Sequence, residues 1–197
     1  MFDFDQRIGE KFGIKYRNST LVFIKTGKGG SIVGCDGKYL RMAEHIFNTF
    51  GCSVVIASNP IDEKCDLAAE VNTVLQGLKT IDKILYIGLS DGALIGAQHG
   101  YEVPLIKRML LINGPLMINP AKTRRGIERF SGEYIEMVYG TLDPSYRYYS
   151  ILEAIHSEIF YASKIEGADH RFSGMEDVLV SCIDKFLESG IYTRQEK

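Results

Sequence analysis

The stretch Tyr86–Ala93 reads YIGLSDGA and places Ser90 between Gly88 and Gly92. The apolar run that precedes it, 84–87, is short, as is typical of a strand buried inside a sheet. A helical pattern rich in small residues follows as far as His99. A chain that turns from strand to helix this sharply leaves little room for side chains beside the turn, and glycine relieves the clash. The pattern therefore predicts a tight turn that exposes the Ser90 hydroxyl.

Short apolar runs alternate with helical periods on both sides of this turn. The expected strands are residues 20–25, 53–57, 84–87, 109–112, 135–139 and 159–162, and the expected helices are residues 38–50, 66–78, 92–99, 151–156 and 178–187. Such alternation is typical of βαβ units, in which helices cover parallel strands. We therefore expect an α/β fold with a mostly parallel central sheet of about six strands, flanked by helices on both faces.

The chain of 197 residues is long enough for one domain with a substantial core. It contains no internal repeat, low-complexity tract or linker, so we expect a single domain over residues 1–197. The first 18 residues allow several interpretations, one of which is an antiparallel edge strand around residues 12–16.

Composition and charge exclude several classes of function. The formal net charge of −2 gives no electrostatic argument for a nucleic-acid partner. No apolar run reaches the 18 residues of a membrane span, and the N-terminal segment lacks the apolar region of a secretory signal. The four cysteines are Cys35, Cys52, Cys65 and Cys182. They form no C-x-x-C pair and have no spacing typical of metal ligands. We therefore expect buried or free thiols in a reducing compartment, no metal and a cytoplasmic location.

Chemistry-bearing residues follow three of the expected strands. Ser90 follows 84–87, Asp143 follows 135–139, and His170 follows 159–162. In open α/β sheets the carboxyl ends of the strands meet at one edge, which is where ligands bind. A serine hydroxyl is a poor nucleophile near neutral pH unless a base accepts its proton and an acid orients that base. The chain order Ser…Asp…His thus predicts a nucleophilic site at this edge.

At these positions the chain resembles the α/β-hydrolase superfamily, from about residue 20 to residue 187. The resemblance rests on three motifs: the nucleophile elbow at 88–92, the acid that ends 139–143, and the histidine within 167–172. It implies an α/β-hydrolase fold with Ser90 as nucleophile, His170 as general base and acid, and Asp143 as the orienting carboxylate. No cofactor or metal is implied.

The resemblance also implies an oxyanion hole. In the family one backbone N–H comes from the residue after the nucleophile, which here is Asp91. The second comes from the loop after an early strand, which often reads His-Gly-x-Gly. This chain has Thr26-Gly27-Lys28-Gly29 there, so the Lys28 N–H is the candidate. The same loop fits neither glycine-rich phosphate-binding pattern.

Further candidates concern the substrate. Residues 117–131 stand where the family inserts its lid, and we expect a short lid-like insertion and an open active site. Arg124 and Arg125 in this segment are candidates for selecting an acidic substrate, with a solvated basic face as the alternative. Tyr146 belongs to a tyrosine cluster that lines the substrate pocket in one interpretation and only packs in the other.

The sequence thus predicts a serine hydrolase that cleaves a carboxylic ester or thioester of a small substrate through an acyl-enzyme on Ser90. Two alternatives remain: an amidase or peptidase with the same three residues, and a binding module that keeps the hydrolase fold without catalysis. The oligomeric state is left open.

Overall fold

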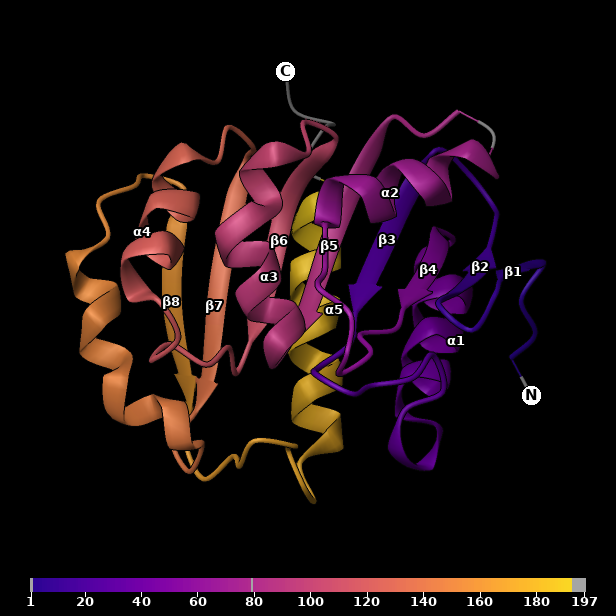
Figure 1. The fold of residues 1–197 in the computed structure, drawn as a ribbon. Coiled ribbons are helices and arrows are strands. Elements are labelled where there is room, and N and C mark those ends of the chain that lie inside the picture. The colour runs from indigo at the N-terminus through magenta and orange to yellow at the C-terminus, as the bar shows by residue number, and fades with distance from the viewer. Residues whose placement is uncertain (1, 79, 193–197) are drawn as a thin grey trace.

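A single mixed sheet runs through the molecule, with helices in front of it and behind it (Figure 1). The computed structural model describes residues 2–78 and 80–192. The strands are β1 (Gln6–Ile8), β2 (Phe12–Lys15), β3 (Thr20–Lys25), β4 (Ser53–Ala57), β5 (Lys83–Leu89), β6 (Ile106–Ile112), β7 (Tyr134–Gly140) and β8 (Phe160–Ile165). Their order across the sheet is β1-β2-β4-β3-β5-β6-β7-β8.

Strands β3 to β8 are parallel, which confirms the predicted mostly parallel sheet. The N-terminal segment adds β1 and β2 in antiparallel pairing beside β4, so the sheet has eight strands rather than about six. The segment around 12–16 does form a strand, β2, but β1 is the outermost one. β1 carries no apolar run that would have predicted it, because it is short and largely exposed.

The helices divide between the two faces of the sheet. They are α1 (Lys38–Phe50), α2 (Leu67–Gln76), α3 (Asp91–His99), α4 (Pro120–Arg129) and α5 (Glu176–Tyr192), with shorter 3-10 segments η1 (Cys35–Gly37), η2 (Gly100–Glu102) and η3 (Pro144–Ala154). Side chains of α2, α3 and α4 pack on one face, and side chains of α1 and α5 pack on the other. The expected helix at 151–156 lies mostly within the 3-10 segment η3.

The core is double because both faces of the central strands are covered. In β3, Leu21 and Phe23 point into one cluster and Val22 and Ile24 into the other, and all four side chains are fully buried. Each such side chain stabilises the fold by about 1.5–3 kcal/mol relative to its exposed form. Burial on both faces explains why these strands read as continuous apolar runs rather than as alternating patterns.

Residues 117–131, expected as a lid-like insertion, form α4 at their centre. This helix packs on α3 so closely that a Cβ on Gly126 would lie 2.1 Å from the Ala97 carbonyl oxygen. α4 is thus the crossover between the parallel strands β6 and β7 and covers the sheet. In the described part of the chain, no helix combines the length and the apolar character needed to cross a membrane.

Candidate active site

Ser90 forms the turn between β5 and α3. Its backbone has φ 54° and ψ −120°, a conformation that costs a non-glycine residue about 1–3 kcal/mol. Neighbouring main chain crowds the turn: a Cβ on Gly88 would lie 2.5 Å from the Gly92 oxygen, and a Cβ on Gly92 would lie 2.3 Å from the Lys25 oxygen. The Ser90 N–H donates to the Ile112 carbonyl at 2.8 Å. The two glycines are therefore required by close approach.

The structure brings together the three side chains that the sequence placed at this edge. Nε2 of His170 lies 3.0 Å from Oγ of Ser90, and Nδ1 is hydrogen-bonded to Oδ2 of Asp143. The Asp143 side chain is fully buried, and its other oxygen accepts a bond from the Ser145 N–H at 2.6 Å. A neutral ring that donates from Nδ1 to a carboxylate presents the lone pair of Nε2 to the hydroxyl.

Asn113 holds the loop that carries the histidine, although the sequence did not mark it as a site residue. Its Nδ2 donates to the carbonyls of Asp169 and His170, both at 3.2 Å, and its Oδ1 accepts from the Gly140 N–H at 2.9 Å. The side chain thereby joins the ends of β6 and β7 to the loop after β8. The signal was present: Asn113 is the polar residue that directly follows the apolar strand β6, and asparagine tolerates its φ of 50°.

Asp169, the other carboxylate near the histidine, forms hydrogen bonds within its own loop. Its Oδ1 accepts bonds from the N–H groups of Arg171 and Ser173, both at 2.9 Å. The bonds from Ser173 are the main reason that the pKa of Asp169 is lowered. Asp143 is thus the carboxylate that contacts the imidazole.

The two backbone N–H groups expected to form the oxyanion hole have no acceptor within the described residues. One belongs to Asp91, at the N-terminus of α3, where N–H groups have no helical partner and the helix dipole is positive. The other belongs to Lys28, in the loop after β3. This loop lies against the serine, since a Cβ on Gly27 would lie 3.1 Å from Cβ of Ser90. The Asp91 carboxylate itself accepts a bond from Asn59 at 2.9 Å.

The loop that carries Lys28 is held from several sides. Thr26 Oγ1 donates to the Gly30 carbonyl at 3.0 Å, and the Asn59 N–H donates to the same carbonyl at 2.9 Å. The Gly27 N–H donates to the Tyr39 hydroxyl at 3.3 Å. Burial raises the pKa of Tyr39, so this hydroxyl stays protonated well above neutral pH. The loop is therefore braced at Thr26, Gly27 and Gly30.

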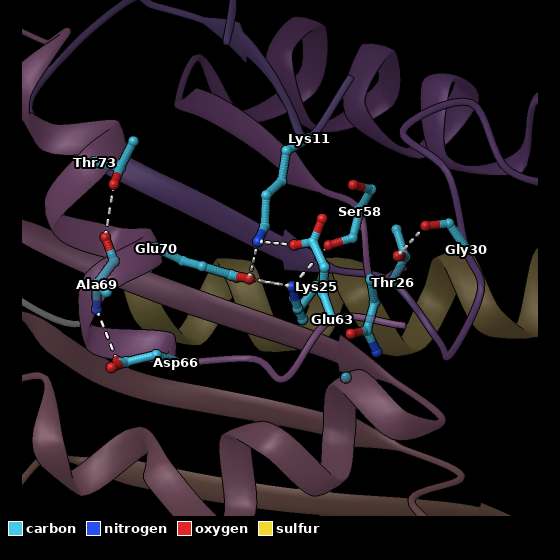
Figure 2. A network of polar contacts seen from close by, with 12 residues as sticks. Lys11, Lys25, Thr26, Gly30, Ser58, Glu63, Asp66, Ala69, Glu70 and Thr73 are labelled. Carbon is cyan, nitrogen blue, oxygen red and sulfur yellow. Dashed lines mark hydrogen bonds and ion pairs between the residues drawn. The ribbon is translucent and has the colours of Figure 1, made fainter. Parts of the chain in front are cut away.

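A buried ion pair supports the base of this loop (Figure 2). Nζ of Lys25, the last residue of β3, lies 2.9 and 2.7 Å from the two Glu70 oxygens and donates to the Ser58 carbonyl at 2.7 Å. Lys25 is fully buried, and Glu70 is 6% exposed. Lys11 lies between Glu70 and Glu63, at 3.4 and 2.6 Å. The network joins α2 to the carboxyl ends of β3 and β4.

A cavity of about 740 Å³ opens beside Ser90 and His170. It is lined by the loop after β3, the start of α1 and the loop before α5. Arg124, Arg125 and Tyr146, the candidates for substrate binding, are not among its lining residues. Arg124 instead pairs with Glu128 on the exposed side of α4, and Tyr146 packs beside another tyrosine of η3. In the described ranges, no cluster of three or more His, Cys, Asp or Glu side chains is placed to hold a metal ion.

No family model and no curated protein sequence matches the chain. Solved structures do resemble it. Est1E from Butyrivibrio proteoclasticus is 12% identical, with a TM-score of 0.72 over 91% of this chain and 93% of its own. A second structure of Est1E has ferulic acid bound. An alpha-beta serine hydrolase homologue from Coxiella burnetii is 16% identical, with a TM-score of 0.68 over 88% of this chain and 89% of its own.

The esterase Pf2001 from Pyrococcus furiosus is 14% identical, with a TM-score of 0.64 over 86% of this chain and 82% of its own. At such low identity, what these proteins share with the chain is the path of the backbone. That path comprises the mostly parallel sheet with helices on both faces. The protein therefore has the α/β-hydrolase fold.

Proposed function

We propose that the protein is a serine hydrolase that cleaves a carboxylic ester or thioester of a small substrate through an acyl-enzyme on Ser90. The observation that carries the proposal is the His170 ring, which contacts Oγ of Ser90 at 3.0 Å on one side and the buried Asp143 carboxylate on the other. A serine is activated when its hydroxyl contacts an imidazole that in turn contacts a carboxylate.

In the acylation step, Oγ of Ser90 attacks the carbonyl carbon while Nε2 of His170 takes the hydroxyl proton. Asp143 stabilises the imidazolium that forms. The carbonyl oxygen becomes an oxyanion, which accepts bonds from the Lys28 and Asp91 N–H groups. One such donor typically contributes about 2.7–4 kcal/mol to the stability of the transition state. Collapse of the tetrahedral intermediate breaks the ester bond, and the leaving alcohol or thiol takes the proton from His170.

Deacylation repeats these steps with water as the nucleophile. His170 removes a proton from water as its oxygen attacks the acyl carbon. The Ser90 oxygen then leaves and takes the proton back, which releases the carboxylic acid. The half-exposed histidine ring is accessible to the water that this step needs. No cofactor takes part in the proposed reaction.

The cavity supports a small substrate, because about 740 Å³ lies in the range of small-molecule sites, roughly 300–1,000 Å³. The structure of Est1E with ferulic acid is consistent with a small carboxylic acid as one product of such a site.

A fluorophosphonate probe tests the proposal, because it reacts with an activated serine and needs no knowledge of the substrate. The wild-type protein should gain one probe mass, read by intact mass spectrometry. Ser90→Ala and His170→Ala should remain unlabelled while keeping the wild-type circular dichroism. Ser31, which lines the same cavity, provides the matched control, and Ser31→Ala should label like wild type. A folded wild-type protein that does not react would favour the binding-module alternative.

A further inference from the structure

The cavity beside Ser90 collects positive charge from separate parts of the chain. Four cationic side chains line it: Lys28, Lys38, Arg41 and Arg171. The first comes from the loop after β3, the next two from the first turns of α1, and the last from the loop that carries His170. Two carboxylates, Asp36 and Glu176, also line the cavity, so its cationic side chains outnumber its acidic ones. The chain as a whole has a net charge of −2.

These four cationic side chains form no ion pairs with carboxylates in the described part of the protein. Lys38 donates to the Arg171 carbonyl at 3.3 Å, and Arg41 donates to the Asp36 carbonyl, so both are directed by backbone oxygens. The Glu176 carboxylate accepts from the Gly174 N–H at 3.2 Å.

The start of α1 adds a second source of positive potential at the same place. This helix of 13 residues has Gly37 as its N-cap, no side-chain cap and no acidic residue in its first turn. The first turn of α1 lines the cavity through Lys38 and Arg41, so the positive end of the helix dipole lies at the cavity. This first turn supplies no anionic side chain to offset the dipole. Cations at a helix N-terminus are unfavourable, and an anion bound there would offset both the dipole and the side-chain charges.

Burial of Lys38 supports this interpretation. Desolvation lowers the pKa of its ammonium group, and the nearby Glu176 and Asp169 only partly compensate. A further anion in the cavity would favour the charged form of the lysine.

We propose that the substrate carries an anionic group in addition to its ester or thioester bond, and that Lys38, Arg41 and Arg171 bind this group. The group has the chemistry of a carboxylate or phosphate, which guanidinium side chains bind through two parallel hydrogen bonds. The inference rests on the proposed function, because it names the substrate class of the same site. In this proposal an acidic substrate is selected by side chains that line the cavity, in place of the arginines on the exposed side of α4.

A pair of esters matched in carbon number tests the proposal: mono-4-nitrophenyl adipate, which ends in a carboxylate, and the neutral 4-nitrophenyl hexanoate. Wild type should hydrolyse the adipate ester with a kcat/KM about 10-fold higher. Arg41→Gln and Arg171→Gln should each lower that value about 5- to 10-fold, mainly through KM, and leave the hexanoate ester within about 2-fold. Both residues are exposed, so neither substitution disturbs the core.

Lys185→Gln removes a charge from an exposed position on α5 away from the cavity and should change neither rate. Equal wild-type rates for the two esters, or equal losses for both in the arginine variants, would overturn the proposal.

Calorimetry separates this proposal from the hydrolase proposal, because binding needs no turnover. Adipate and inorganic phosphate are titrated into Ser90→Ala, and the stronger binder identifies the class of anion. Binding that disappears in the Arg41→Gln/Arg171→Gln double variant would support the anion site even if no probe labels Ser90. Probe labelling of Ser90 with no binding of either anion and no ester preference would remove the anion site and leave the hydrolase proposal intact.

Discussion

At the residue scale, unusual backbone conformations concentrate around the candidate site. Ser90, Asn113 and Phe172 all have positive φ, at 54°, 50° and 58°. They lie at the ends of β5 and β6 and just after His170. Residues other than glycine keep such conformations only where surrounding contacts enforce them. Here those contacts are the close main-chain approach at Ser90 and the three hydrogen bonds of the Asn113 amide.

Asn113→Ala should therefore impair catalysis through the position of His170. We expect kcat to fall about 10-fold with little change in KM, because the histidine loop loses its two anchoring donors while the cavity is unchanged. Stability should fall by about 1–3 kcal/mol, since the Gly140 N–H loses its buried acceptor. Ester kinetics and urea unfolding measure the two effects.

Asn119 provides the matched control. It also has positive φ, 51°, but it caps α4 by accepting from the Lys122 N–H at 3.1 Å. Asn119→Ala should cost about 1 kcal/mol of stability as a lost cap and leave kcat unchanged. If both alanine variants lost stability and neither lost activity, Asn113 would be only a structural residue.

At the element scale, the buried pair of Lys25 and Glu70 connects helix α2 to the strand end beside the site (Figure 2). Glu70→Gln should destabilise the fold by about 3–5 kcal/mol, because it leaves the fully buried ammonium of Lys25 without its counter-ion. The double variant Lys25→Met/Glu70→Leu removes both charges and should recover most of this loss. Urea unfolding at neutral pH measures each free energy.

An exposed ion pair gives the comparison. Lys15 and Asp5 are 3.1 Å apart, with side chains 25% and 48% exposed. Asp5→Asn should cost less than about 1 kcal/mol, because water already screens this pair. A Glu70→Gln variant that lost no more than Asp5→Asn would show that water or a rearrangement compensates the buried lysine.

The same pair shows what sequence patterns can and cannot predict. The strand at 20–25 was predicted with its observed bounds, because its middle residues are apolar and buried on both faces. The lysine at its end reads as a solvent-exposed residue, and its partner lies 45 positions further along the chain. Asn113 was missed for a related reason, since its role depends on two loops that only the tertiary fold brings together. By contrast, Ser90, Asp143 and His170 were placed at one edge by the general rule for parallel strands.

At the scale of the whole molecule, two buried tyrosines link the core to the site. Tyr86 donates to the Gly92 carbonyl at 2.6 Å, and Tyr139 donates to the Gly114 carbonyl at 3.0 Å. Both side chains are fully buried, and desolvation raises the pKa of each well above 10. In the unfolded chain both would titrate near pH 10. Above that pH the folded protein keeps two protons that the unfolded chain has released, so stability must fall as pH rises.

The fall should be about 1.4 kcal/mol per pH unit for each buried tyrosine between pH 10 and the onset of alkaline unfolding. Urea unfolding followed at several pH values by far-ultraviolet circular dichroism measures this slope, and tyrosinate absorbance should appear for these two residues only with the unfolding transition. Tyr139→Phe should remove its share of the slope while lowering stability at pH 7 through the lost bond to Gly114.

If residues 1–197 form the single predicted domain, both probes must report one transition, because Tyr86 and Tyr139 lie in the same apolar cluster as β2 at the far side of the sheet. The chain has 11 tyrosines, so the signal of Tyr139 is taken as the difference between wild type and Tyr139→Phe. If that difference signal rose before the loss of dichroism, the core around the site would open independently of the rest.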